Sequence, residues 1–285
     1  MPARQVRRMD FCRQNAPDHH YDAGLEEGSD SPRAMQETGL PAPHPGAGLR
    51  RIERTLGRIF LLLFLGWAGG IANSAHAAEG LALAIVYDTS GSMRDSVPTA
   101  DGKKAAKYLI ANRALEHIIQ RIDHFTTNAA VLRPVQAGLF VFHGQGVREA
   151  VPFGPFQSAR MLDWVKNYKG PDSGTPLGLA IEAASRPLLA SKLDQKHILV
   201  ITDGQNTIGP DPVGIVPRIQ KSAANRGSSV FVHFVAFDVD AKVFNDLKKL
   251  GVTVVGAADE KQLNQQLEFI LEEKILLERE EPKKP

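Results

Sequence analysis

The chain has 285 residues, of which 43% are apolar and 23% charged, and this composition is typical of one or two globular domains. Its formal net charge is only +2, and no cluster of Lys and Arg is evident after residue 77, so the sequence does not favour nucleic acid as a partner. The single cysteine, Cys12, lies in a segment that we expect to be removed. The mature domain therefore has no disulfide, thiolate metal site or cysteine nucleophile.

Residues 1–49 are rich in Gly, Pro, Ala and charged residues and show no apolar periodicity. Such a segment cannot bury enough apolar surface to fold, so we predict a disordered leader. A leader of this length is unusual before the segment that follows it. Either it is a genuine extension, or translation starts later, for example at Met35.

Residues 50–77 have the three parts of a secretory signal peptide. Four arginines, at positions 50, 51, 54 and 58, precede an apolar stretch at 59–68, and a small-x-small site ends at Ala77. The apolar stretch is well short of the roughly 20 residues that a membrane-spanning helix needs. We therefore predict cleavage after about Ala77 and a periplasmic or secreted domain. An uncleaved signal anchor, which would hold the chain at the membrane, is the alternative.

From residue 78 onward, apolar strand-like runs alternate with amphipathic helical patterns. The predicted strands are 81–87, 137–142, 150–153, 197–202, 230–237 and 252–255, and the predicted helices are 103–124, 158–168, 176–185, 212–225, 241–250 and 261–280. This alternation predicts one α/β domain over 78–285, ending in a C-terminal helix. Its central sheet should be doubly wound and mostly parallel, with helices on both faces and one short antiparallel edge strand at 150–153.

Three polar clusters lie where strands or loops of this fold end. Asp88, Ser90 and Ser92 follow the first strand, Thr175 precedes a helix, and Asp203 follows the strand at 197–202. In open parallel sheets, ligands bind beyond the carboxyl ends of the strands. Carboxylate and hydroxyl oxygens are hard ligands, which suit Mg²⁺, Mn²⁺ or Ca²⁺ better than Zn²⁺ or Cu²⁺.

Together these residues resemble the metal-ion-dependent adhesion site of the von Willebrand factor A (vWA) family. The family pattern is Asp-x-Ser-x-Ser, then Thr on a second loop and Asp on a third, and this chain fills all five positions. The resemblance implies hydroxyl ligands from Ser90, Ser92 and Thr175, with Asp88 and Asp203 binding directly or through water. It implies Mg²⁺ as the cofactor, with Mn²⁺ or Ca²⁺ as alternatives.

The resemblance also implies that one coordination position stays open for an Asp or Glu of a partner protein. We expect the loops around the five ligands to form the contact surface, with Met93, Arg94, Gln205 and Asn206 on its rim. The predicted function is thus an exported vWA domain that binds a divalent cation and, through it, a partner protein. The alternative is an accessory factor for the maturation or metal insertion of an exported enzyme, and a third possibility is a structural domain with a vestigial site.

Catalysis is not favoured by the sequence. Asp95, Asp172, Asp238 and His143 form no pair with ligand or acid–base spacing and are predicted to lie in solvated loops, whereas His233 is predicted to be a core histidine. Ser90 lacks the Gly-x-Ser-x-Gly setting of a nucleophile elbow. No Gly-rich nucleotide loop is evident either. We therefore predict that the protein is not an enzyme.

Overall fold

The computed structural model describes residues 78–127, 133–171 and 174–276. The predicted leader at 1–49, the signal peptide at 50–77 and the end of the last helix beyond 276 lie outside these residues, as does Asp172. Within the described ranges, no helix combines the length and the apolar character needed to cross a membrane.

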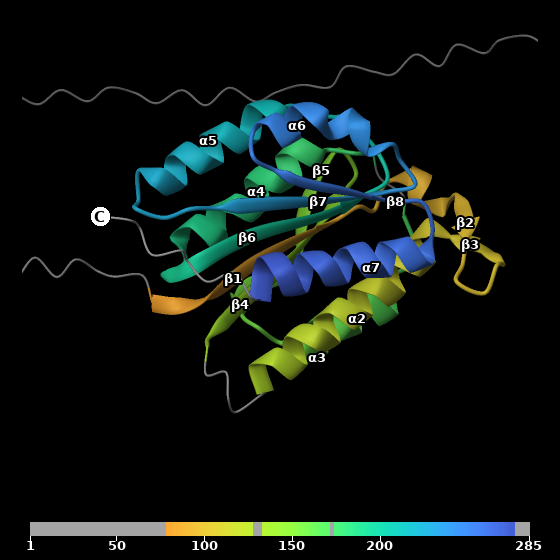
Figure 1. Ribbon diagram of the computed structural model, residues 1–285, viewed down its shortest axis with the longest axis horizontal. Coiled ribbons are helices and arrows are strands. Elements are labelled where there is room, and N and C mark those ends of the chain that lie inside the picture. Colours follow the sequence, from red (N-terminus) through yellow and green to blue (C-terminus); the bar gives the residue numbers. More distant parts are fainter. Residues whose placement is uncertain (1–77, 128–132, 172–173, 277–285) are drawn as a thin grey trace, which may run out of the picture. The chain divides into compact units, whose positions relative to one another are not determined.

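A six-stranded sheet forms the centre of the domain, with strand order β5-β4-β1-β6-β7-β8 (Figure 1). Its strands are β1 (Ala78–Tyr87), β4 (Val135–His143), β5 (Gly146–Pro155), β6 (Leu193–Thr202), β7 (Phe231–Phe237) and β8 (Thr253–Ala257). All neighbouring pairs are parallel except β4 and β5. This confirms the mostly parallel α/β sheet.

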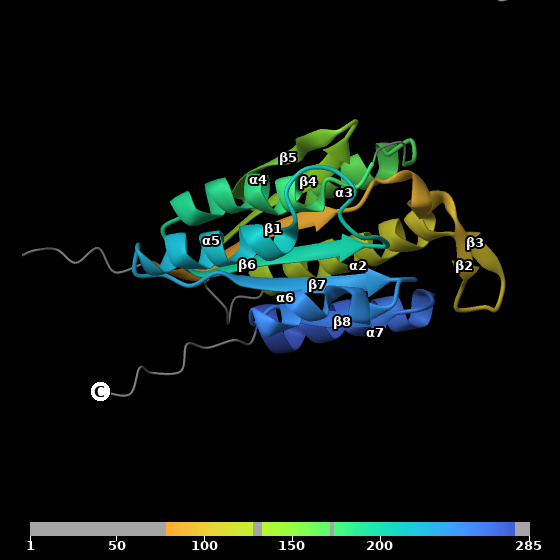
Figure 2. The same cartoon turned by 90° about the horizontal axis from the view of Figure 1, so that it is seen from above.

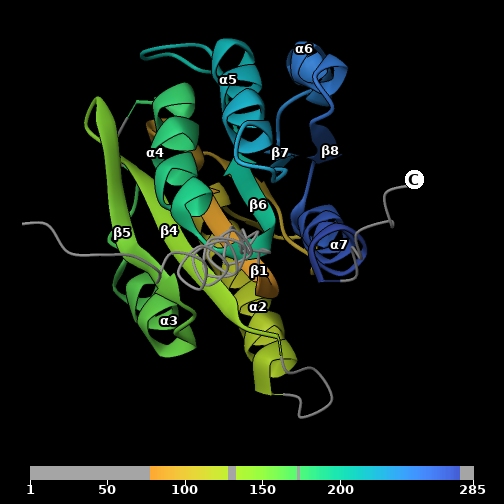
Figure 3. The same ribbon diagram turned by 90° about the vertical axis from the view of Figure 1, so that its left-hand side faces the viewer.

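Helices cover both faces of the sheet (Figure 3). One face carries α2 (Lys107–Thr127), α3 (Ser158–Asn167) and α7 (Glu260–Ile270), and the other carries α4 (Leu177–Ala190), α5 (Pro212–Ala224) and α6 (Asn245–Lys249). A π-helical turn, η3 (Leu271–Leu276), extends α7, and two short 3₁₀ helices are η1 (Gly91–Arg94) and η2 (Ala241–Phe244).

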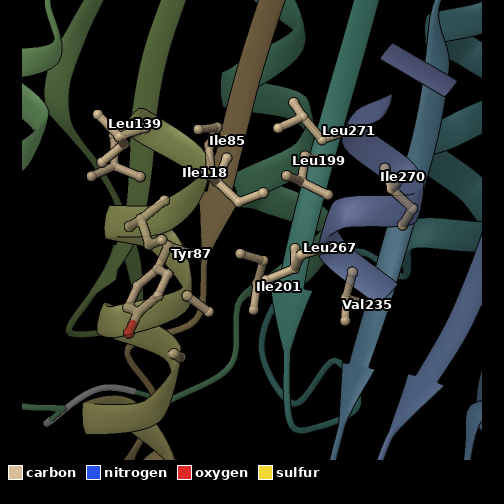
Figure 4. Close-up of a cluster of buried hydrophobic side chains, with 14 of the residues drawn as sticks. Ile85, Tyr87, Ile118, Leu139, Leu199, Ile201, Val235, Leu267, Ile270 and Leu271 are labelled. Carbon is tan, nitrogen blue, oxygen red and sulfur yellow. The ribbon is translucent and has the colours of Figure 1, made fainter. Parts of the chain in front are cut away.

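Strand β1 is buried on both faces, as its continuous apolar run predicts. Because side chains alternate along a strand, Leu83, Ile85 and Tyr87 join the core under α2 and α7, whereas Ala82 and Ala84 face α4. Figure 4 shows Ile85 and Tyr87 among the large side chains of the first core, beside Ile118 of α2 and Leu267 of α7. Burial on both sides fixes β1, and the loop after it therefore starts from a rigid position.

Several predicted elements differ from the structure at their boundaries: β6 starts at Leu193 rather than at 197, and α4 ends at Ala190 rather than at 185. The antiparallel edge strand β5 has ten residues rather than the short run at 150–153, because most of its side chains are exposed or only partly buried and give no apolar run. The helix predicted at 103–124 begins only at Lys107. Before it lies a hairpin of β2 (Ser96–Pro98) and β3 (Lys104–Ala106), at the end of the domain where β1 ends (Figure 2). Lys and Ala favour helices locally, but the pairing with β2 overrides that preference.

Candidate functional site

The pairing of β1 with β6 brings two of the predicted site residues together. The two strands are parallel neighbours, and Tyr87 pairs with Ile201 at their carboxyl ends. The backbone N–H of Asp88 continues the ladder by donating to the carbonyl of Ile201 at 3.0 Å. Asp88 therefore lies beside Thr202, and Thr202 directly precedes Asp203 in the chain.

Asp88 is fully buried, and each of its carboxylate oxygens accepts a hydrogen bond. Oδ1 accepts from the backbone N–H of Ser90 at 2.7 Å, and Oδ2 accepts from the hydroxyl of Thr202 at 2.6 Å. Burial raises the pKa of Asp88 to about 6, and the negative charge of Asp203 adds to this, although the hydrogen bonds from Ser90 and Thr202 act in the opposite direction. The negative charges of Asp88 and Asp203 thus repel each other, and this repulsion opposes the ionisation of Asp88.

The two serines connect the first loop to Asp203. Their hydroxyl oxygens lie 3.0 Å apart, and the Ser92 hydroxyl donates to Asp203 Oδ1 at 2.8 Å, with the Ser90 hydroxyl 3.4 Å from the same oxygen. The Asp203 side chain is completely buried. Four of the five predicted residues are therefore joined by direct hydrogen bonds within one small volume.

Thr175, the fifth predicted residue, lies on the adjacent loop just before α4. It is buried, and its backbone is held by Thr207, whose hydroxyl accepts from the Thr175 N–H at 3.1 Å and whose N–H donates to the Thr175 carbonyl at 2.9 Å. The Thr175 hydroxyl oxygen would lie 4.0 Å from a β-carbon at Gly204, the residue after Asp203. The structure thus places all five residues at the same end of the sheet.

Two contacts fasten the loop after β6 to the start of α4. The side-chain oxygen of Asn206 accepts from the N–H of Gly178 at 3.1 Å, and its amide nitrogen donates to the carbonyl of Gly209 at 3.2 Å. Gly178 also packs directly on the backbone, since a β-carbon there would lie 1.9 Å from the carbonyl oxygen of Pro210. The loops that carry Thr175 and Asp203 are therefore joined to each other.

Lys107 belongs to this site, although the sequence analysis did not single it out. Its ammonium lies 2.9 Å from Asp203 Oδ2, 3.0 Å from Asp238 Oδ2 and 4.0 Å from Asp95 Oδ2, and its side chain is only 5% exposed. Burial alone would lower the pKa of Lys107, but the hydrogen bonds and charges of Asp203 and Asp238 outweigh it and raise that pKa, so the side chain is cationic at neutral pH.

A signal for Lys107 was present in the helical pattern. Lys107 stands four residues before Ala111, on the side of α2 whose residues are buried, and that side also carries Ile110 and Ala114. A charged residue on the buried side of a helix needs a partner of opposite charge. That argument could have been made from the sequence, although it does not identify Asp203 or Asp238 as the partners.

The rim residues are only partly as predicted. Arg94 and Gln205 are exposed beside the site. The prediction of Met93 as a rim residue is wrong, because its side chain turns inward from η1 and is completely buried in the core under α2. Asn206 is half-buried and bound to two backbone groups, so it shapes the loop rather than presenting a free side chain.

Of the residues considered for catalysis, Asp95 and Asp238 both lie near the Lys107 ammonium. Asp95 and His143 are exposed, as expected for loop residues. Asp238 was predicted to lie free in solvent, but it is paired with Lys107, because the end of β7 lies next to the end of β6. His233 is buried as predicted, and its Nε2 lies 3.1 Å from Nδ1 of His197.

Within the part of the chain that the structure describes, no group of three or more His, Cys, Asp or Glu residues is arranged to hold a metal. The ligand set discussed above is of another kind, because three of its five members are hydroxyls. Such neutral oxygens with two carboxylates suit a hard cation that keeps some of its water.

Residues 82–273 match the sequence profile of the von Willebrand factor type A domain. The chain belongs to this family. Among solved structures, this vWA domain is similar to the PilB minor pilin from Streptococcus sanguinis, with a TM-score of 0.53 and 13% identity over 69% of this chain and 61% of the pilin. It is also similar to the vWF domain of the type V pili tip protein Mfa5 from Porphyromonas gingivalis, with a TM-score of 0.53 and 13% identity over 72% of this chain and 98% of that one. No curated protein sequence matches the chain.

Proposed function

We propose that this protein is an exported vWA domain that binds one divalent cation and holds a partner protein through it. The observation that carries the proposal is the contact of the Ser90 and Ser92 hydroxyls with Asp203, beside the buried carboxylate of Asp88. Thr175 lies on the adjoining loop and completes the set of five. Export rests on the signal-peptide pattern of residues 50–77, and the similarity to the two pilus proteins supports the fold alone.

The chemistry of these donors fits Mg²⁺, with Mn²⁺ or Ca²⁺ as close alternatives. A serine hydroxyl that donates its proton to Asp203 still has lone pairs for a cation. In the metal-free protein, the raised pKa of Asp88 reflects burial and the repulsion between two nearby carboxylates. A divalent cation would relieve both effects, since it supplies the opposite charge.

A partner carboxylate is the natural additional ligand of such an ion. Three hydroxyls and two carboxylates leave room for water on a six-coordinate cation, and an Asp or Glu from another protein can replace that water. Arg94 and Gln205, which are exposed beside the site, would contact the same partner. A binding role without catalysis remains part of this proposal.

The first test is metal binding by the full chain, measured by isothermal titration calorimetry. We expect one site for Mg²⁺ and for Mn²⁺, with affinity at least 100-fold weaker in Asp88→Ala and Thr175→Ala. Thr99→Ala is the matched control, because the hydroxyl that it removes donates to Asp101 in the hairpin and not to any of the five predicted ligands. A wild-type chain that binds neither ion would contradict the proposal.

The second test is an affinity pull-down from an envelope extract of the source cells, with and without a chelator. We expect a partner that is retained by the wild type only when the metal is present and is not retained by Asp88→Ala. The site of contact is then checked by replacing exposed Asp and Glu residues of that partner. The accessory role would instead leave no metal-dependent partner, while the Asp88→Ala strain loses the activity of one exported enzyme.

A further inference from the structure

A buried cation already stands beside the proposed ion site. Lys107 is the first residue of α2, and its ammonium lies between carboxylates from two different strand ends, Asp203 after β6 and Asp238 after β7. Its backbone N–H donates to the carbonyl of Asp95 at 2.8 Å. The rest of α2 packs into the core, so the position of Lys107 is fixed by the fold.

Lys107 determines which oxygen of Asp203 faces the rest of the site. Oδ2 receives the ammonium at 2.9 Å, whereas Oδ1 accepts from Ser92 at 2.8 Å. One oxygen is therefore committed to the lysine and the other to the serine hydroxyls. With the ammonium absent, the buried carboxylate could rotate, and both its oxygens could turn toward a cation.

The lysine also changes the charge that an incoming ligand meets. Asp88 and Asp203 together would neutralise a divalent cation, and a buried ammonium adds a positive charge. Asp238 and Asp95, whose side chains are 42% and 73% exposed, offset that charge only in part. Repulsion between the ammonium and the ion opposes metal binding, while the same excess charge attracts a carboxylate. The two affinities should therefore depend on Lys107 in opposite directions.

We propose that Lys107 is a positioning residue that holds Asp203 against the serine hydroxyls and sets the balance between two affinities of the site, weakening the binding of the cation and strengthening the binding of an acidic ligand. This inference rests on the proposed function. It concerns a side chain outside the five predicted ligands.

The test compares Lys107→Met and Lys107→Arg with the full wild-type chain at pH 8. Mn²⁺ affinity is measured by electron paramagnetic resonance, and acetate binding to the Mn²⁺-saturated protein is measured by water proton relaxation. We expect Lys107→Met to bind Mn²⁺ about tenfold more tightly and acetate about tenfold more weakly. Lys107→Arg, which keeps the charge, should stay within about threefold of the wild type on both measurements.

A reciprocal variant acts on the same balance from the other side. Asp238→Asn removes the nearer of the two carboxylates that offset Lys107 from outside the five ligands, so we expect Mn²⁺ to bind about threefold more weakly and acetate about threefold more tightly. The backbone of Asp238 has a φ of 54°, which asparagine tolerates well, so this variant should fold normally. Lys103→Met is the control, because that lysine is exposed and pairs only with Asp101.

The outcomes separate the possible failures. If folded Lys107→Met weakens both affinities or changes neither, or if Asp238→Asn shows no opposite shift, Lys107 has a structural role only and the inference is wrong. Should Lys107→Met fail to fold by circular dichroism, Asp238→Asn and Lys107→Arg decide the question. A wild-type chain that does not bind Mn²⁺ would instead overturn the proposed function, and this inference with it.

Discussion

Two regions of the same sheet bury titratable groups in opposite ways. At the carboxyl ends of the strands, the charged residues Asp203 and Lys107 are buried together as an ion pair. Within β6 and β7, by contrast, His197 and His233 stack on each other with ring centroids 5.4 Å apart and are 0% and 2% exposed. Alternation along the strands places both histidines on the face covered by α7.

The histidines are kept neutral, whereas the site keeps its charges. Burial lowers the pKa of His197 to about 3, with His233 adding to the effect, and burial together with the nearby charge of Lys274 lowers the pKa of His233 to about 4. Burial also acts to lower the pKa of Lys107, but the hydrogen bonds and charges of Asp203 and Asp238 outweigh it and raise that pKa. A buried group thus stays charged only where opposite charges and hydroxyls surround it, which is the condition for holding a cation.

The largest expected effect is on the histidine pair. Both folded pKa values lie below the unfolded value of about 6.5, so the stability that the neutral pair contributes is present above that pH and is lost as the pH falls toward 4 and 3. Between pH 7 and 5, we expect the free energy of unfolding to fall by about 4 kcal/mol more in the wild type than in His197→Leu/His233→Phe. Urea denaturation at each pH, followed by circular dichroism, measures this free energy. An equal change between pH 7 and 5 in the two proteins would contradict the prediction.

A smaller effect is expected when the buried ion pair is broken. Lys107→Met leaves the carboxylate of Asp203 buried without its counter-charge, which should lower the free energy of unfolding of the metal-free protein by about 3 kcal/mol. The matched control Lys103→Met should leave it unchanged, because that lysine is exposed. Equal urea midpoints for the two variants would show that the charges at this end are as dispensable as those on the surface.

The smallest expected effect is that of Asp88, whose contribution to stability depends on pH in the opposite direction to that of the histidines. The folded pKa of Asp88, about 6, exceeds its unfolded value of 3.8, so its contribution to stability is present below 3.8 and is lost as the pH rises through 6. From pH 7 to pH 5, Asp88 should therefore add about 1 kcal/mol in the metal-free protein. Asp88→Asn should lose this gain. Saturating Mg²⁺ should suppress it in the wild type, and a gain that persists at saturation would argue against metal contact with Asp88.

The fold and the place of the site could largely be predicted from the sequence. Buried strands such as β6 have continuous apolar runs, and strands that alternate with helices pair in parallel. Parallel strands end at the same edge, so Asp88 and Asp203 had to lie near each other once β1 and β6 were neighbours. The position of Thr175 just before a helix brought the second loop to the same place.

The rest depended on contacts that no local pattern encodes. The helical pattern places Lys107 on the buried side of α2, but only the ends of β6 and β7 show that Asp203 and Asp238 are its partners. Asp238 likewise looks like a solvated loop residue in the sequence, because its partner Lys107 is far from it along the chain. Met93, between polar neighbours, gave no sign that its side chain turns into the core. The hairpin of β2 and β3 was hidden because its second strand consists of residues that favour helices.

The close approach of Gly178 to Pro210 has a consequence for how this site tolerates genetic change. A β-carbon at Gly178 would collide with the carbonyl oxygen of Pro210. Because this oxygen belongs to the backbone, it can move away only if the loop of Pro210 moves as well. Replacement of Gly178 by alanine would therefore push apart the loops of Thr175 and Asp203 while leaving every ligand in the sequence. Among natural variants, a single methyl group at this position could silence the site as completely as the loss of an aspartate.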